Sequence, residues 1–306
     1  MYRSILVPLD GSPLAEWALP AAIHSARRVG ATLELITIEV VIPTLGGAGL
    51  ATTDTQPGTA VPNQAETYLA EVAQRIAAVY PGPLKQTVHS GIGRPAEIML
   101  EYAKDNADLI VMATHGYGPL KRFWLGSFAD TVARRSQLPT LLIRPPSENR
   151  VELAREPRFQ RVLVPLDGSE AALSVIDHAL AVAEPKAELT LFNAVSSVLA
   201  FGPDYALMPL PTDGEVLMAR QDEARKVMEA VADTLRARNI TVRTEVVLEP
   251  FAASAVLDYA HTNGFDLIAL TTHGRGGAAR LLLGSVADKI VRGAEVPVLL
   301  FRPPAD

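Results

Sequence analysis

Short apolar runs alternate with amphipathic segments through the first half of the chain. The apolar runs are rich in Ile, Leu and Val and lie at residues 3–9, 32–40, 84–90, 108–114 and 139–143. Nearly unbroken apolar character is typical of parallel strands that are covered on both faces. Segments with helical signals lie between the runs, at 13–29, 63–80, 95–106 and 127–137. Ser12 followed by Pro13 marks the start of the first helix, and Gly30 marks its end. This alternation predicts right-handed crossovers and an open, doubly wound parallel sheet.

The same pattern occurs a second time in the chain. Residues 5–12 return as 162–169, residues 114–116 as 272–274, and residues 139–144 as 297–302, always in the same order. An ordered repeat of this length indicates a duplicated domain, because its period is too long for a solenoid. We therefore predict an α/β protein with two tandem, doubly wound, five-stranded parallel sheets. The predicted domains are 1–146 and 159–306, joined by a Pro-containing, charged linker at 147–158.

Two long connections interrupt the pattern, at residues 42–62 and 196–214. Connections of this length are uncommon in a compact domain, and they predict a lid, an interface arm or a mobile loop. In open sheets of this type, ligands bind outside the carboxyl ends of the strands. The residues at those ends therefore decide the function.

Composition narrows the class of protein. The 306 residues are 48% hydrophobic and 20% charged, which supplies a core and excludes a disordered chain. The net charge of −6 argues against a nucleic-acid-coating protein, which would present a basic face. The absence of Cys excludes a disulfide framework, thiolate metal sites and a Cys nucleophile. Because the first apolar run stops at Pro8 and no stretch is long enough for a membrane span, we expect a cytoplasmic protein without membrane or nucleic-acid partners.

A glycine-containing segment follows the fourth predicted strand of each copy. In copy one, residues 113–116 read Ala-Thr-His-Gly, and after nine intervening residues Gly126-Ser127 opens a helix. In copy two, residues 271–274 read Thr-Thr-His-Gly, and Gly284-Ser285 follows at the same spacing. Glycine permits a sharp turn with bare N–H groups close to a ligand, and helix starts favour phosphate. The serine hydroxyl either caps the helix or bonds a phosphate oxygen. Each copy is therefore predicted to hold an anion in a cradle of main-chain donors.

With these motifs the chain resembles the universal stress protein family in its tandem two-domain form, over nearly its whole length. The nucleotide signature of that family is Gly-x2-Gly-x9-Gly-(Ser/Thr), and its fold is similar to that of adenine-nucleotide α-hydrolases and other Rossmann-like proteins. The resemblance implies ATP as the ligand. By position it implies adenine and ribose contacts from Asp10, Ile38, Asp167 and Ala194, and ribose and phosphate contacts from Gly116, Gly126, Ser127, Gly274, Gly284 and Ser285. Asp10 and Asp167 are also candidates for holding a nucleotide-bound Mg²⁺.

Both copies depart from the signature at its first glycine, which is Ala113 in copy one and Thr271 in copy two. Alanine adds one methyl group, whereas threonine is β-branched and prefers extended backbone. Copy two also lacks the Gly93-x-Pro95 turn that precedes the third helix of copy one. Nucleotide binding is therefore favoured more strongly in copy one than in copy two.

The histidines divide into two groups. His115 and His273 are equivalent and lie in the cradle loops, where each is a candidate for a ligand contact or a structural hydrogen bond. His24, His178 and His261 fall within predicted helices without a second histidine at metal-ligand spacing, and we predict them at the surface.

Three functions are compatible with these motifs. The first is a stress-response regulator that binds ATP in one or both domains and hydrolyses it slowly or not at all, because no obvious catalytic base is present apart from the Asp and His candidates. The alternatives are a nucleotide-free dimerisation or scaffolding module and an enzyme that splits ATP to transfer an adenylyl group. We favour the first function and assign no catalytic residue and no metal site. The resemblance also implies pairing of the last strands, here 139–143 with 297–301 within one chain, and further association into a homodimer.

Overall fold

The structure is a computed structural model that describes residues 2–41, 64–114, 125–146, 151–196, 198–199, 208–209, 214–272 and 283–303. In copy one the elements are β1 (Ser4–Pro8), the 3-10 helix η1 (Ala15–Ala18), α1 (Leu19–Val29), β2 (Thr32–Val40), α2 (Gln64–Ala77), β3 (Leu84–Gly91), α3 (Pro95–Asn106), β4 (Leu109–Ala113), α4 (Ser127–Arg135) and β5 (Thr140–Ile143). In copy two they are β6 (Arg161–Pro165), α5 (Glu170–Leu173), α6 (Val175–Val182), β7 (Glu188–Val195), β8 (Val198–Leu199), β9 (Met208–Pro209), α7 (Gly214–Arg236), β10 (Thr241–Leu248), α8 (Ala252–Thr262), β11 (Leu267–Thr271), α9 (Ser285–Gly293) and β12 (Val298–Phe301).

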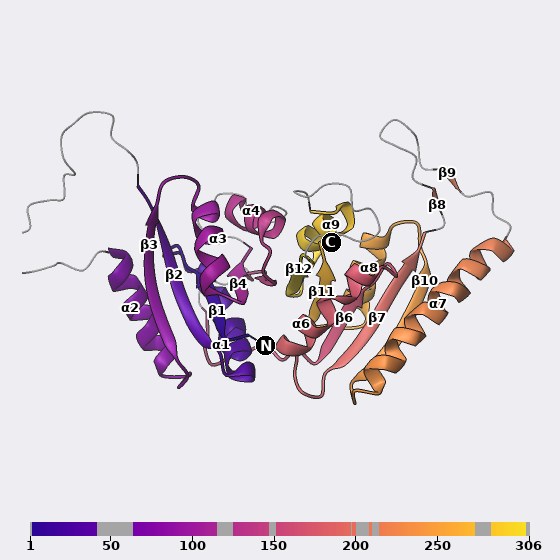
Figure 1. Cartoon of the computed structure of the whole chain (residues 1–306), viewed down its shortest axis with the longest axis horizontal. Helices are drawn as coiled ribbons and strands as arrows, with labels where there is room; N and C mark the ends of the chain where they lie inside the picture. Colours follow the sequence, from indigo (N-terminus) through magenta and orange to yellow (C-terminus); the bar gives the residue numbers. More distant parts are fainter. Residues whose placement is uncertain are drawn as a thin grey trace, which may run out of the picture.

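Ten strands of the described residues form one sheet, in the order β10-β7-β6-β11-β12-β5-β4-β1-β2-β3. Within each copy, neighbouring strands of this sheet are parallel, so the predicted doubly wound α/β class is confirmed. Between the copies, β5 and β12 pair in antiparallel fashion, with Leu141 opposite Leu299. The two predicted five-stranded sheets are therefore halves of one continuous sheet (Figure 1).

Helices cover both faces of the sheet. Ile5 and Val7 of β1 belong to a core cluster that includes residues of α1, α2, α6 and α7. Leu6, between them, belongs to a second cluster with residues of α3, α4, α8 and α9. This division follows from strand geometry, since successive side chains point to opposite faces. Both clusters contain residues of both copies, so the hydrophobic core continues through the β5–β12 junction.

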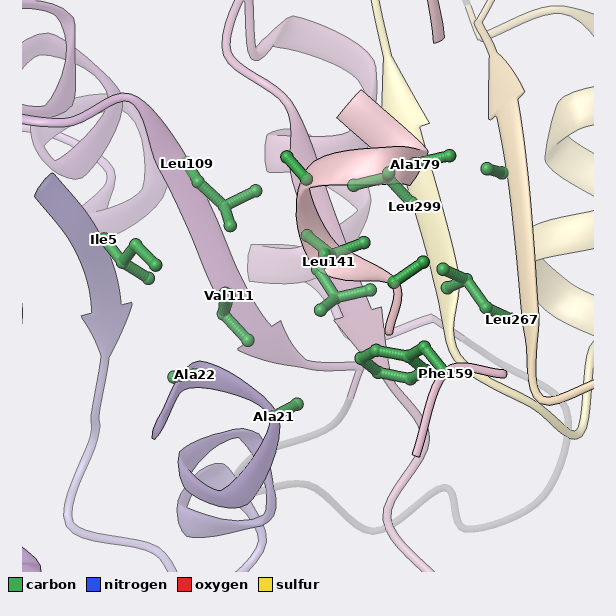
Figure 2. Packing of buried hydrophobic residues seen from close by; sticks show 14 of the residues in the cluster. Ile5, Ala21, Ala22, Leu109, Val111, Leu141, Phe159, Ala179, Leu267 and Leu299 are labelled. Carbon is green, nitrogen blue, oxygen red and sulfur yellow. The ribbon is translucent and has the colours of Figure 1, made fainter. Parts of the chain in front are cut away.

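We call the region where the two copies meet the seam; it comprises β5, β12, α1, α6 and the residues that precede β1 and β6. Leu141 and Leu299 lie beside each other in its core and are fully buried (Figure 2). Tyr2 precedes β1 and stacks on His178 of α6, with ring centroids 5.9 Å apart. Phe159 precedes β6 and packs its ring edge-on against His24 of α1 at 5.4 Å. Each copy thus contributes an aromatic ring to a histidine of the other.

The surface prediction for His24 is wrong. Its side chain is buried, with Nε2 lying 3.1 Å from the carbonyl oxygen of Val182 at the end of α6. His178 is half-buried, because Tyr2 and Phe301 cover its ring. His24 is buried because α1 packs against α6, and His178 is partly covered by Tyr2 of the other copy. Helical periodicity within one copy reveals neither contact. His261 is exposed, as predicted.

The first helix is predicted to begin at residue 13, but it begins at Ala15 and its first turn is a 3-10 helix. The Oγ of Ser12 accepts a hydrogen bond from the amide of Ala15 at 3.1 Å, and a 3-10 helix follows before α1 starts at Leu19. Pro20 lacks an N–H and so cannot bond to the carbonyl of Glu16 in the α-helical manner. The amide of Leu19 donates to that carbonyl instead, which gives the tighter 3-10 turn.

Several predicted segments fall partly or wholly outside the described residues. The connection at 42–62 lies wholly outside them, and of the connection at 196–214 only residues 196, 198–199, 208–209 and 214 are described. Within the predicted linker, residues 151–158 carry no helix or strand, and Val151 and Leu153 are buried in the core. None of the described helices has both the length and the apolar character needed to cross a membrane.

Candidate functional site

Each copy has a cavity at the carboxyl ends of its strands. In copy one, β2 and β4 lie on opposite sides of β1, so the strand order reverses there and leaves a crevice beyond the strand ends. The cavity at this point has a volume of about 300 Å³. The equivalent cavity of copy two lies beyond β6, β7 and β11 and has a volume of about 550 Å³. Both are lined by a mixture of apolar strand residues and the first residues of a helix, α4 or α9.

The aspartate after the first strand is held by its own loop. In copy one, Oδ1 of Asp10 accepts a hydrogen bond from the amide of Ser12 at 2.9 Å. In copy two, Oδ1 of Asp167 accepts from both the amide and the hydroxyl of Ser169, at 3.0 and 2.6 Å. The intervening Gly11 adopts φ +80°, in the left-handed region that favours glycine. The loop therefore fixes the carboxylate at the cavity before any ligand is bound.

The helix start opposite this carboxylate is fixed by main-chain hydrogen bonds. The amide of Gly126 donates to the carbonyl of Thr114 at 3.0 Å, and the amide of Gly284 donates to the carbonyl of Thr272 at 2.9 Å. The chain thus leaves the end of the fourth strand and returns to the same point to begin a helix. A Cβ at position 284 would lie 2.8 Å from the carbonyl oxygen of Thr272, so this return requires glycine.

The first amides of α4 line the cavity. The first i→i−4 bond of this helix runs from the amide of Asp130 to the carbonyl of Gly126 at 2.8 Å. The amides of Ser127, Phe128 and Ala129 precede that bond and have no acceptor within the helix, as is general at helix starts. The dipole adds positive potential at the same place, so the arrangement suits an anion.

Of the two roles predicted for the serine, a helix cap or a phosphate contact, the helix cap is wrong. Gly126 and Gly284 occupy the N-cap positions, and neither helix has a side-chain cap. Ser127 and Ser285 are instead the first helical residues, and both are exposed at the edge of their cavities. Their hydroxyls are therefore available to a ligand, and a phosphate contact stays a prediction.

The structure brings most of the predicted site residues together. The cavity of copy one is lined by Asp10, Ile38, Ala113, Gly126 and Ser127. The cavity of copy two is lined by the equivalents Asp167, Ala194, Thr271, Gly284 and Ser285. The other predicted site residues, His115, Gly116, His273 and Gly274, lie outside the described residues.

Sequence reasoning missed part of the apolar lining. Ile36, Pro95, Met112 and Phe128 also line the cavity of copy one. Met112 lies near the end of the predicted strand 108–114, so the rule that ligands bind at carboxyl ends was a usable signal for it. Ile36 lies in the middle of the predicted strand 32–40, where that rule gives no signal. Phe128 directly follows Gly126-Ser127, but a motif based on glycine and hydroxyl residues gives its side chain no role.

Comparison with known proteins agrees with this architecture. The model of the universal stress protein family matches residues 1–144 and 158–302, which is nearly the whole chain. The chain belongs to the universal stress protein family. Each of the two matched segments contains one complete cavity of those described above, so the chain is a tandem member of that family.

Individual proteins similar to this chain are also universal stress proteins. A universal stress protein of Mycobacterium tuberculosis is 32% identical over 215 residues, which are 68% of this chain and 66% of the relative. A universal stress protein of Synechocystis is 22% identical over 98% of this chain and 100% of its own length.

Solved structures share the tandem fold. The crystal structure of a universal stress protein from Archaeoglobus fulgidus is 18% identical, has a TM-score of 0.61 and is covered over 98% of each chain. A functionally unknown protein from Pseudomonas aeruginosa has a TM-score of 0.65 at 18% identity, over 99% of this chain and 93% of that one. The α/β fold of the whole chain is therefore one that other proteins with two copies adopt.

Proposed function

We propose that this family member is a stress-response regulator that binds ATP in its two cavities. The observation that carries the proposal is that each cavity combines an apolar floor with the unbonded first amides of a helix. An apolar floor suits a purine ring, and helix amides suit phosphate. The separation of these two parts also fits a nucleotide, because β2 and the start of α4 lie on opposite sides of β1.

The same geometry supports binding without rapid hydrolysis. Among the described residues that line the cavity of copy one, Asp10 alone has an ionisable side chain, and in copy two Asp167 alone does. One oxygen of each carboxylate already accepts hydrogen bonds from its loop. Amides that bind phosphate in the ground state lower the barrier to hydrolysis only if they bind the transition state better. We therefore propose turnover slower than about 1 s⁻¹, the lower end of ordinary enzyme rates.

In this proposal, Mg²⁺ binds together with ATP. Among the described residues there is no cluster of three or more carboxylate or histidine side chains that could hold a metal ion. Mg²⁺ usually keeps several waters and takes one or two carboxylates besides phosphate oxygens. Asp10 and Asp167 are the side chains that fit this requirement, and they would hold the ion only together with the nucleotide.

The proposal is tested by placing a negative charge where the phosphates are expected. Ser127→Glu puts a carboxylate at the first position of α4, where it stabilises the helix by its interaction with the dipole but repels phosphate. Ser285→Glu does the same in copy two. Native mass spectrometry with excess ATP should count two nucleotides on the wild-type chain, one on each single variant and none on the double variant.

Neutral substitutions provide the control. Ser127→Gln and Ser285→Gln have nearly the same bulk as the glutamate variants without the charge, so they should keep more of the nucleotide. A wild-type chain that binds no ATP would contradict the proposal. Full occupancy of the double glutamate variant would contradict the assignment of the phosphate position to the helix starts.

A further inference from the structure

The two cavities are built from equivalent residues, yet they differ in size. The cavity of copy two is about 550 Å³ and that of copy one about 300 Å³. A family signature treats both as one kind of site. Side chains at equivalent positions of the described lining differ between the copies, and these can be compared directly.

Three positions are smaller in copy two. At the end of the second strand, Ala194 of β7 stands where copy one has Ile38 of β2. At the second residue of the helix, Val286 of α9 stands where α4 has Phe128. At the start of the third helix, Ala252 stands where copy one has Pro95.

Two positions are larger in copy two, and they do not close the cavity. Phe192 replaces Ile36, but its ring is almost fully buried (1% exposed) and packs against Tyr259, with centroids 4.9 Å apart. Its bulk therefore goes into the core beneath α8. Thr271 replaces Ala113 at the end of the fourth strand, on the side of the cavity next to the helix start. Part of the space gained in copy two therefore lies beside the helix start, where Val286 replaces Phe128, and part lies at the other end, where Ala194 replaces Ile38.

That end of the cavity is the apolar one. The order β2-β1-β4 places Ile38 two strands away from the strand to which the helix start is bonded, which is about 10 Å at ordinary strand spacing. The equivalent order β7-β6-β11 does the same for Ala194. A ligand whose phosphates lie at the helix start therefore has its base beside residue 38 or residue 194.

We propose that the two copies select different ligands: the cavity of copy two takes an adenine nucleotide with a ring-sized apolar group on its base, and that of copy one does not. Ala194 in copy two and Ile38 in copy one are the residues that decide this. The inference rests on the proposed function, since it assumes phosphates at both helix starts. The physical reason is steric, because a packed site tolerates added atoms only where space exists.

The test uses ATP and N6-benzyl-ATP as probes of the full chain, with native mass spectrometry and calorimetric titration. The wild-type chain should bind two ATP but one N6-benzyl-ATP. Ser285→Glu should remove the bound N6-benzyl-ATP, and Ser127→Glu should leave it in place, which assigns it to copy two. Ala194→Ile should lower the affinity for N6-benzyl-ATP at least about tenfold more than the affinity for ATP.

The reciprocal variant and a control keep the test independent of folding defects. Ile38→Ala should create a second N6-benzyl-ATP site in copy one, a gain that misfolding does not produce. Val195→Ile, next to Ala194 but packed against the core of the opposite sheet face, should leave the ratio of the two affinities unchanged. Equal binding of N6-benzyl-ATP to both copies, or to neither, while ATP binds would overturn the inference and leave the proposed function standing. If neither ATP nor N6-benzyl-ATP bound to the wild-type chain, both this inference and the proposed function would be overturned.

Discussion

At the scale of single residues, Gly284 is a position at which an added Cβ atom would clash with the backbone. Its amide bonds to the carbonyl of Thr272, and a Cβ would lie 2.8 Å from that same oxygen. Contacts this short between Cβ and a backbone oxygen require the backbone to shift. The glycine therefore has a structural role at the return of the chain, whatever ligand the cavity holds.

We expect Gly284→Ala to lower the free energy of unfolding by about 1–3 kcal/mol, the usual cost of overpacking. Urea denaturation followed by circular dichroism measures this. Gly214→Ala at the start of α7 is the matched control, since nothing lies within 4 Å of its would-be Cβ, and its effect should stay within about 0.5 kcal/mol. Equal effects of the two substitutions would contradict this account of the turn.

His178 gives a prediction about pH. Burial against Tyr2 and Phe301 lowers its pKa below the ordinary value of 6.5, although Asp177 acts in the opposite direction. The His178 side chain therefore takes up a proton more readily in the unfolded chain than in the folded chain. The stability that this difference contributes is present above about pH 6.5 and is lost as the pH falls below it.

Replacing His178 by Gln should reduce the loss of stability between pH 7 and pH 5, because a group that does not titrate no longer contributes to it. The measurement is the midpoint of urea unfolding at each pH. His261→Gln is the control, since the His261 side chain is 78% exposed. A pH dependence that His178→Gln leaves unchanged would count against the burial argument.

At the scale of elements, α4 and α9 are joined by a reciprocal set of ion pairs. Arg134 of α4 lies 2.7 Å from Asp288 of α9, and Arg292 of α9 lies 2.7 Å from Asp130 of α4. Each arginine also pairs with the aspartate four residues earlier on its own helix, at 2.8 and 3.0 Å. These side chains are about three-quarters buried, so solvent screens them less than it screens exposed pairs. In Figure 1 the two helices lie next to each other at the centre of the molecule.

A double-mutant cycle of Arg134→Met and Asp288→Asn should give a coupling free energy of about 0.5–2 kcal/mol, because the two residues share one network. The exposed pair Arg225–Asp222 within α7 is the control and should give about 0.5 kcal/mol or less. Raising the salt concentration should weaken both couplings. A coupling between Arg134 and Asp288 no larger than the control value would mean that these pairs add nothing to the joining of the copies.

At the scale of the whole molecule, the continuous sheet and the shared core predict joint unfolding of the two copies. Both core clusters contain residues of both copies, and the β5–β12 ladder lies between them. Calorimetry should therefore give one transition, with a ratio of calorimetric to van't Hoff enthalpy near about 1. Two separable transitions would show that each copy unfolds alone.

Leu141→Ala tests the same idea by substitution. Leu141 is fully buried opposite Leu299, so its truncation should cost about 2–5 kcal/mol. If the copies unfold together, the whole transition moves to lower temperature rather than splitting. Val216→Ala on the exposed face of α7 should change stability by less than about 0.5 kcal/mol.

The sequence by itself determined the fold of each copy and most of the cavity lining. Period, strand composition and turn residues act locally, so the β2 and α3 ranges could be predicted closely from residues 32–40 and 95–106. The repeat then extended the prediction to copy two. Asp10, Ile38 and Ser127 could be predicted because they lie at strand ends or at a helix start, where local signals are strongest.

Only the tertiary structure decided what depends on contacts between distant segments. Pro20 delayed the α-helix through a missing donor, and His24 became buried because α1 meets α6 of the other copy. Likewise, the different sizes of the two cavities depend on Phe192 turning its ring toward Tyr259, while Ala194 leaves space beside it. Such outcomes depend on how side chains from separate elements share one volume, and no local pattern along the chain encodes that.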